Sequence, residues 1–419
     1  MNKKLSSPLL SSDGAKNTLS SLTAIGFGLL TGCLLILLVS AFDKDFTLKS
    51  AFEGIKLILF GVFSKGRDAG GSLVFGFSGA NIGNLLFRAT PIIMTGLSVA
   101  LAFRSGLFNI GASGQYLMGT AATLIIALSL PTESVPPVLV WLLAFAGSLV
   151  AGALWGMIPG FLRAYFNINE VLSCIMTNWI AANLVTLIFE NSSLRNSAQS
   201  GKIGYIMPTS LNGVATAKLG LDKVFPSSQV NGGIIIAIGF AVLVYILLSK
   251  TTLGFEMKIC GSNRHAAHYA GIKQNRKILL AMALAGSLSG AAAALYYLSG
   301  NTEFFWSTYQ TLPREGLNGI PVALLASNNP LAVIFTSMFM SFLGVAGQQL
   351  KTLTAFNEYI TDIIIALIVY LSAFSLVIKQ YLSSRKGRRD ISSASGAGGK
   401  TKNIIPAPQG KLNEESEAG

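Results

Sequence analysis

The residues that could do chemistry in this chain are few and scattered. Both histidines, His265 and His268, fall in one polar segment, GSNRHAAHYAGI (261–272), and a helix would place them on the same face. Two histidines so arranged can bind zinc, but no third ligand of matching character follows nearby, so we interpret them as surface residues. The three cysteines show neither a metal-ligand spacing nor a pairing pattern. We therefore expect no metal site.

Motifs typical of bond-cleaving enzymes and of nucleotide-binding proteins are also missing. No GxxxxGK[ST] motif occurs, so the chain has no phosphate-binding loop of that type. No Ser-His-Asp set and no pair of acidic residues is arranged for catalysis. We expect no catalytic residue and no cofactor in this chain.

Uncharged polar residues offer a different chemistry, a hydrogen-bonding passage for a neutral solute. A helical step of 100° per residue aligns polar side chains in two segments, 105–120 and 169–181. The first stripe contains Asn109, Ser113 and Thr120, and the second contains Glu170, Ser173 and Thr177. Such stripes can equally hold helices together in lipid, and that alternative stays open. The candidate pathway residues in and beside them are Asn109, Ser113, Gln115, Thr177 and Asn178.

The elements that carry these stripes must cross a membrane. Half of the chain is apolar (51%), only 12% is charged and the mean hydropathy is +0.58. A soluble domain would carry about twice that charged fraction. The net charge of +13 could indicate nucleic-acid binding, but basic loops on the cytoplasmic side of a membrane explain it better. We expect no nucleic-acid partner.

The apolar runs predict an all-α polytopic membrane protein with about ten transmembrane helices. The segment 317–326 is short, but counting it gives the even number that basic residues at both ends of the chain require. Residues 52–63 are too short to cross, and they predict an interfacial or re-entrant helix on the outside. The expected spans are 20–42, 82–103, 107–130, 137–161, 171–190, 231–249, 277–299, 317–326, 331–347 and 360–379.

Charge asymmetry predicts which parts face the cytoplasm. Residues 1–19 form an expected cytoplasmic tail, 20–380 the transmembrane domain, and 381–419 a disordered basic cytoplasmic tail. The loop 251–276 is rich in lysine and arginine, so it is expected inside the cell, with both termini on the same side.

Two segments, AGSLVAGALWG (146–156) and AGSLSGAAAAL (285–295), look alike. Their expected spans run in opposite directions, so close packing between helices rich in small residues explains the likeness more simply than duplication.

Four stretches together resemble a known family. They are FRSGLFNIGASGQYLMG (103–119), GALWGMIPGFLRAYFNINEVLSCIMTNWIA (152–181), TTLGFEMKICGSNRHAAHYAGIKQNRKILLAMALAGSLSGAAAAL (251–295) and GIPVALLASNNPLAV (319–333). They are similar to permease subunits of bacterial ABC importers of the branched-chain amino acid and ribose type. Within that group they are closest to the nucleoside or simple-sugar permeases served by basic-membrane-protein lipoproteins. The resemblance covers roughly 80–380.

This resemblance implies a transport subunit rather than an enzyme. It implies a ten-span core in a bacterial plasma membrane, a second permease subunit of related fold, and a cytoplasmic ABC ATPase that binds ATP and Mg²⁺. It also implies an external substrate-binding lipoprotein. A secondary carrier for a small polar solute remains the alternative. It is disfavoured because carboxylates near the middle of the spans, which ion-driven carriers use, are scarce.

The resemblance gives the segment 261–272 a role. In such permeases the matching pattern GxNxxAAxYAGI is the coupling helix that docks in a groove of the ATPase. Independently, a short cytoplasmic helix with small residues suits close docking, although an ordinary connecting loop is the alternative. The matching residues are Gly261, Asn263, Ala266, Ala267, Tyr269, Ala270, Gly271 and Ile272.

Two departures from the family pattern lie near the expected pathway. Family members usually have Glu where this chain has Ser113, and Asp where it has Asn318. Both differences remove a charge, and they add Asn318 to the candidate pathway residues.

Overall fold

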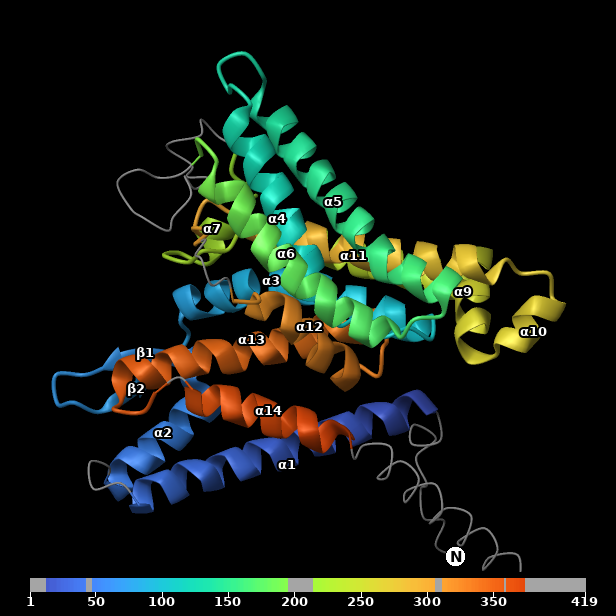
Figure 1. Cartoon of the computed structure of the whole chain (residues 1–419). Coiled ribbons are helices and arrows are strands. Elements are labelled where there is room, and N and C mark those ends of the chain that lie inside the picture. Colours follow the sequence, from blue (N-terminus) through green and yellow to red (C-terminus); the bar gives the residue numbers. More distant parts are fainter. Residues whose placement is uncertain (1–12, 43–46, 195–213, 306–310, 358, 374–419) are drawn as a thin grey trace, which may run out of the picture. The chain divides into compact units, whose positions relative to one another are not determined.

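The fold is taken from a computed structural model, which describes residues 13–42, 47–194, 214–305, 311–357 and 359–373 (Figure 1). The expected tail 381–419 lies outside the described residues. Nearly all of the regular structure is helical, so the all-α prediction is confirmed. The helices are α1 (Asp13–Phe42), α2 (Leu48–Phe60), α3 (Gly79–Arg104), α4 (Ala112–Ser129), α5 (Pro137–Phe166), α6 (Glu170–Glu190), α7 (Leu221–Val224), α8 (Gly233–Lys250), α9 (Thr252–Ser262), α10 (Arg264–Tyr269), α11 (Gln274–Tyr297), α12 (Arg314–Leu325), α13 (Pro330–Leu353) and α14 (Tyr359–Ala373).

Seven helices of the described chain are long and apolar enough to cross a membrane: α1, α3, α5, α6, α8, α11 and α13. The other three expected spans correspond to α4, α12 and α14. Each of the ten expected segments therefore overlaps a helix. The short segment 317–326 lies in α12, which has only 12 residues. That length is well below the roughly 20 residues that a full crossing requires.

Helices α3 and α11 form the centre of the helical packing, with α4, α5, α12 and α13 around them. The contact between α5 and α11 is made by small residues. A Cβ on Gly152 or Gly286 would collide with the backbone of the other helix, and Gly290 meets Ser148 in the same way. The two similar glycine- and alanine-rich segments thus face each other, which agrees with the helix-packing interpretation.

The segment between α1 and α3 holds more structure than the sequence predicted. The expected helix at 52–63 is present as α2, whose first turn is capped by Thr47 and Ser50. A two-stranded antiparallel hairpin follows, β1 (Ser64–Arg67) and β2 (Leu73–Phe75), which the sequence did not predict. Arg67 fixes it by donating to Leu353 O (2.7 Å) and by pairing with Glu53 (2.6 Å).

Helix α1 begins at Asp13 and packs against α14. The end of the expected N-terminal tail, 1–19, is therefore helical from Asp13, because the polar residues before the apolar run continue the helix. The contact is close: a Cβ on Gly32 would lie 2.6 Å from Ile364 Cγ1.

Candidate functional site

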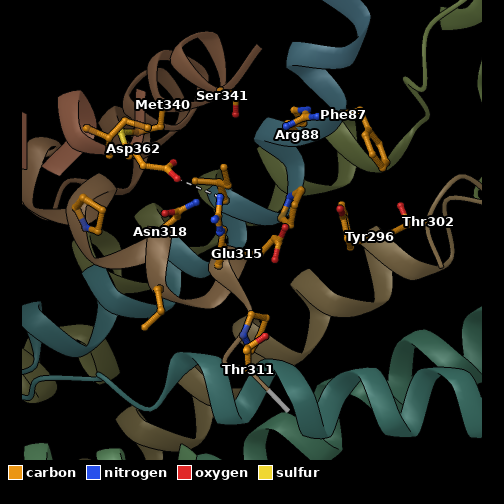
Figure 2. Close-up of a pocket in the computed structure, with 18 of the residues that line it drawn as sticks. Phe87, Arg88, Tyr296, Thr302, Thr311, Glu315, Asn318, Met340, Ser341 and Asp362 are labelled. Carbon is orange, nitrogen blue, oxygen red and sulfur yellow. Dashed lines mark ion pairs between the residues drawn. The ribbon is translucent and has the colours of Figure 1, made fainter. Parts of the chain in front are cut away.

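A cavity of about 1370 Å³ lies among helices α3, α11, α12, α13 and α14. Its volume exceeds the roughly 300–1,000 Å³ of ordinary small-molecule pockets, so it has room for a metabolite and water. Figure 2 shows side chains from these helices converging on it. The lining residues used below are Phe87, Arg88, Tyr296, Arg314, Glu315, Asn318, Ser341, Gly344 and Asp362.

One wall of the cavity is aromatic. Phe87 of α3 and Tyr296 of α11 stack with ring centroids 5.6 Å apart and planes at 18°. Figure 2 shows this pair on the same side of the cavity as Thr302. Aromatic faces of this kind bind flat or ring-shaped solutes through stacking and apolar contact.

Charged groups of both signs also line the cavity. Two arginines, Arg88 and Arg314, and three acidic residues, Glu303, Glu315 and Asp362, lie on it. Arg314 and Asp362 form an ion pair of 3.2 Å between the starts of α12 and α14, drawn as a dashed line in Figure 2. The near balance of charge suits a neutral polar solute better than an anion.

Arg88 is the residue that the sequence reasoning missed. It lies within the expected span 82–103, and a charge there is costly unless it faces a polar cavity. In the structure it is exposed on the cavity wall and Nη2 donates to Gln348 Oε1 at 2.9 Å. The sequence alone could have identified Arg88, since an arginine inside an apolar run marks a functional position by default.

Glu315 lies in the first turn of α12, before the expected span that begins at residue 317. Burial raises the pKa of its carboxyl group above the ordinary value, while its own backbone N–H, Arg88 and Arg314 act in the opposite direction. The carboxylate therefore interacts with Arg88 across the cavity.

Ser341 of α13 adds an unpartnered polar atom to the cavity wall. It is 2% exposed, and its hydroxyl has no hydrogen-bond partner among the described residues. Buried hydroxyl groups normally have a partner, so this one is an exception among the described residues. Figure 2 shows Ser341 between Met340 and Arg88.

Of the six candidate pathway residues, Asn318 lines the cavity, whereas the other five are buried between helices. Asn109 and Gln115 exchange two hydrogen bonds, of 2.8 and 2.9 Å. Asn109 also donates to Ser98 Oγ at 3.0 Å, and Ser98 Oγ in turn accepts from Ser289 at 2.9 Å. These bonds connect α3 and α11 to the start of α4.

Residues in and beside the second stripe also form hydrogen bonds within the protein. Asn178 Oδ1 accepts from Gly114 N at 2.8 Å, and its Nδ2 donates to Ile110 O at 3.0 Å. Thr177 Oγ1 donates to Cys174 O in its own helix. Ser113 lies against α12, where a Cβ on Gly316 would come within 2.6 Å of its Cα. These contacts hold helices together, and whether a solute also passes them remains a prediction.

The segment 261–272 contains the short helix that the sequence predicted. Asn263 ends α9 and caps α10, with Oδ1 accepting from Ala266 N at 3.0 Å. Gly271 then takes a left-handed φ of 72°, which turns the chain towards α11 without steric cost. In Figure 1 this part projects at one end of the described helices, next to α9.

The residues of α10 divide into an outward and an inward set. Tyr269 is 91% exposed, and His265, Ala266 and Ala270 are exposed too. Ala267 is fully buried within this chain. The turn of the helix directs Ala267 inwards, and whether it contributes to docking remains a prediction. Gly261, Asn263 and Gly271 are exposed, whereas Ile272 is half-buried.

The end of α9 touches the turn between α3 and α4 directly. A Cβ on Gly261 would collide with the backbone of Ser105 and Gly106, and Gly106 has a left-handed φ of 70°. A side chain on either Gly106 or Gly261 would prevent this close approach of the two backbones. Helix α3, which contains Pro91, extends from this contact to the cavity, where it carries Phe87 and Arg88, so a single helix connects the α9–α10 segment to the cavity.

The described residues contain no cluster of three or more His, Cys, Asp or Glu side chains that could hold a metal ion. His265 and His268 are both exposed. A second, smaller cavity of about 470 Å³ lies beside α10, lined by His268, Lys273 and Arg276 among others.

Comparison with known proteins finds related sequences along most of the chain. Residues 81–373 match the family described as the permease component of the branched-chain amino acid transport system. The guanosine ABC transporter permease protein NupP of Bacillus subtilis is 31% identical over 87% of this chain and 95% of its own length. The nucleoside ABC transporter permease protein NupB of Lactococcus lactis is 34% identical over 74% and 83%.

A glucose ABC transporter permease protein of Haloferax volcanii is 31% identical over 71% of this chain and 77% of its own length. Bacillus subtilis also has a second, more distant match, the guanosine ABC transporter permease protein NupQ, which is 25% identical over 61% and 78%. The matched family region contains the cavity and the α9–α10 segment but not α1, α2 or the hairpin.

Proposed function

Because this chain belongs to the family of permease components of branched-chain amino acid transport systems, it is the membrane subunit of an ABC importer, and we propose that it passes nucleosides or simple sugars into the cell. It is a multi-pass membrane protein and a transport subunit, not an enzyme. ATP binds to a separate ATPase chain of the importer.

The observation that carries this proposal is the lining of the cavity. Stacked aromatic rings, amide and hydroxyl groups and nearly balanced charges suit an uncharged, ring-shaped solute. Relatives named for guanosine, for nucleosides and for glucose agree with such a solute. Both solute classes present ring faces and many hydrogen-bonding groups.

Membership in the family implies partner chains, an ATPase and a substrate-binding protein. We propose further that the binding protein is an external lipoprotein and that a second, related permease completes the membrane part. The two matching guanosine permeases of Bacillus subtilis support a pair of different chains.

Energy coupling is proposed to run through α10. Its exposed residues Ala266, Tyr269 and Ala270 would dock in a groove of the ATPase, with Gly261, Asn263, Gly271 and Ile272 shaping the segment. We propose accordingly that both chain termini lie in the cytoplasm of a bacterial cell. Movement of α10 would reach α3 through the contact between Gly106 and Gly261.

Uptake measurements test the proposed function. The chain would be co-expressed with its ATPase, partner permease and lipoprotein, and uptake of labelled guanosine, uridine, glucose and leucine compared in cells lacking other carriers. ATP-dependent uptake of a nucleoside or a sugar, and not of leucine, is expected. Uptake of leucine alone would contradict it.

A secondary carrier, the alternative from the sequence, would work without an ATPase. The membership of this chain in a family of transport-system permease components argues against a secondary carrier. Uptake that persists when the ATPase chain is deleted would favour the carrier.

A further inference from the structure

We propose that Arg88 and Glu315 form a ligand subsite that holds the edge of an uncharged ring, with a hydrogen-bond acceptor of the ligand on Arg88 and a neighbouring donor on Glu315. Tyr296 would contact the face of the same ring. This inference rests on the proposed function and names the residues and ligand chemistry of its cavity.

Arg88 is placed and oriented for such a contact. It is a charged residue inside a transmembrane helix, a costly position that is typical of functional sites. It takes part in no ion pair among the described residues, and Gln348 accepts one of its hydrogen bonds. A guanidinium group has five N–H donors, so several remain for a solute.

Glu315 faces the same cavity from α12. It too belongs to none of the ion pairs of the described chain, although its carboxylate interacts electrostatically with Arg88. Two opposite charges that share a cavity without closing into a pair leave a gap of more than 4 Å between them. Figure 2 shows Glu315 between Asn318 on one side and Tyr296 on the other.

The packing of α3 against α12 fixes this gap. Thr95 Oγ1 of α3 donates to the Glu315 carbonyl oxygen at 2.8 Å. One turn further along α12, a Cβ on Gly319 would lie 2.6 Å from the Thr95 backbone. The two backbones therefore approach without an intervening side chain, which fixes the spacing of α3 and α12 at this point.

The chemistry of the subsite defines its ligand. An arginine donates to ring carbonyl oxygens or hydroxyls, and a carboxylate accepts from ring N–H groups or hydroxyls. A nucleobase with neighbouring C=O and N–H groups satisfies both residues at once, and so does a sugar with two adjacent hydroxyls.

The test uses the complete importer in proteoliposomes, with saturating lipoprotein loaded with guanosine in one arm and glucose in the other. The variants are Arg88→Gln, Arg88→Lys, Glu315→Gln, Tyr296→Phe and Tyr296→Leu. Arg163→Gln, which breaks an ion pair with Glu170 far from the cavity lining, is the matched control.

The solute that the wild-type importer transports, guanosine or glucose, shows whether the bound ring belongs to a nucleoside or to a sugar. In the arm with that solute, Arg88→Gln and Glu315→Gln are expected to lower the maximal uptake rate about tenfold, as loss of a hydrogen bond to a charged group implies. Tyr296→Leu should lower it too, whereas Tyr296→Phe, Arg88→Lys and the control should stay close to the wild type.

Selectivity separates a ligand contact from a structural role. In the nucleoside arm, 2-aminopurine riboside, which lacks both the 6-carbonyl oxygen and the N1 hydrogen of guanosine, should move more slowly than guanosine in the wild type. The difference should become smaller in Arg88→Gln and in Glu315→Gln, because each variant removes one of the two contacts. For a sugar the corresponding pair is glucose and a deoxyglucose.

Each failure has its own signature. Wild-type transport of neither solute would overturn the proposed function. Wild-type transport with both charge variants within twofold of normal would overturn the subsite alone. Loss of rate in the assembled variants with an unchanged preference between ligand and analogue would assign Arg88 and Glu315 a structural role, which also contradicts the subsite.

Discussion

Gly261 at the end of α9 and Gly106 between α3 and α4 meet backbone to backbone, with no space for a Cβ on either residue. The contact joins the segment before α10 to the helix that carries Phe87 and Arg88 on the cavity wall. It gives the proposed docking segment a direct backbone contact with the end of a helix that lines the proposed solute site.

The first prediction concerns this contact. Gly261→Ala should force α9 away from the turn, because the obstacle is backbone and cannot rotate aside. We expect ATP hydrolysis that is no longer stimulated by loaded lipoprotein, measured on the purified complex. Gly239→Ala in α8 is the control, since a Cβ there meets nothing within 4 Å and alanine favours helices. Normal stimulation in Gly261→Ala would rule out coupling through this contact.

The second prediction concerns the outer surface of α10. Ala266→Glu and Ala270→Glu place a charge on exposed positions, so the permease should still fold and insert. A buried unpaired charge in a close contact costs several kcal/mol, so the ATPase should be lost on co-purification. Ala69→Glu, at an exposed position of the β1–β2 turn, should retain it. Retention of the ATPase by both α10 variants would leave 261–272 as a plain connecting loop.

Ala267→Glu should behave differently from its neighbours. Ala267 is buried in its own chain, so a glutamate there should lower the amount of folded permease rather than its binding to the ATPase. Size-exclusion chromatography in detergent would distinguish the two effects. Monodisperse Ala267→Glu at wild-type yield would be inconsistent with the inward orientation.

The cavity can be blocked without disturbing helix packing. Gly344 lines it, and a Cβ at this position meets nothing within 4 Å. Gly344→Trp should therefore abolish uptake while the assembled complex keeps its normal yield. Gly239→Trp, equally open but outside the lining residues, should transport normally. Unchanged uptake in Gly344→Trp would mean that solute takes another path.

The buried polar network gives a stability prediction. Asn109→Ala removes a side chain that bonds to Ser98 and Gln115, and it leaves Gln115 without its partner. The expected cost is about 1–3 kcal/mol, seen as a lower thermal unfolding temperature of the purified permease. Loss of uptake with unaltered thermal stability would instead favour direct contact of Asn109 with solute.

The sequence by itself determined the apolar segments, the short helix within 261–272 and the family. Hydropathy, helical periodicity and capping are local properties, so ten runs such as 82–103 and 231–249 are readable without a fold. The family motifs are also contiguous, and they include the glycines at 106 and 261. The interpretation of 146–156 and 285–295 as packing segments needed only their small residues.

Tertiary structure alone decided which polar side chains meet each other and which meet a cavity. Asn109 and Asn318 are both amides in helical segments, yet one is fully buried in a hydrogen-bond network and the other lines the cavity. The difference depends on how each helix is rotated against its neighbours. Ala267 is directed inwards by the turn of α10. Glu315 and Arg88 line the same cavity because α12 and α3 pack together at Gly319 and Thr95. Such long-range contacts leave no local pattern in the sequence.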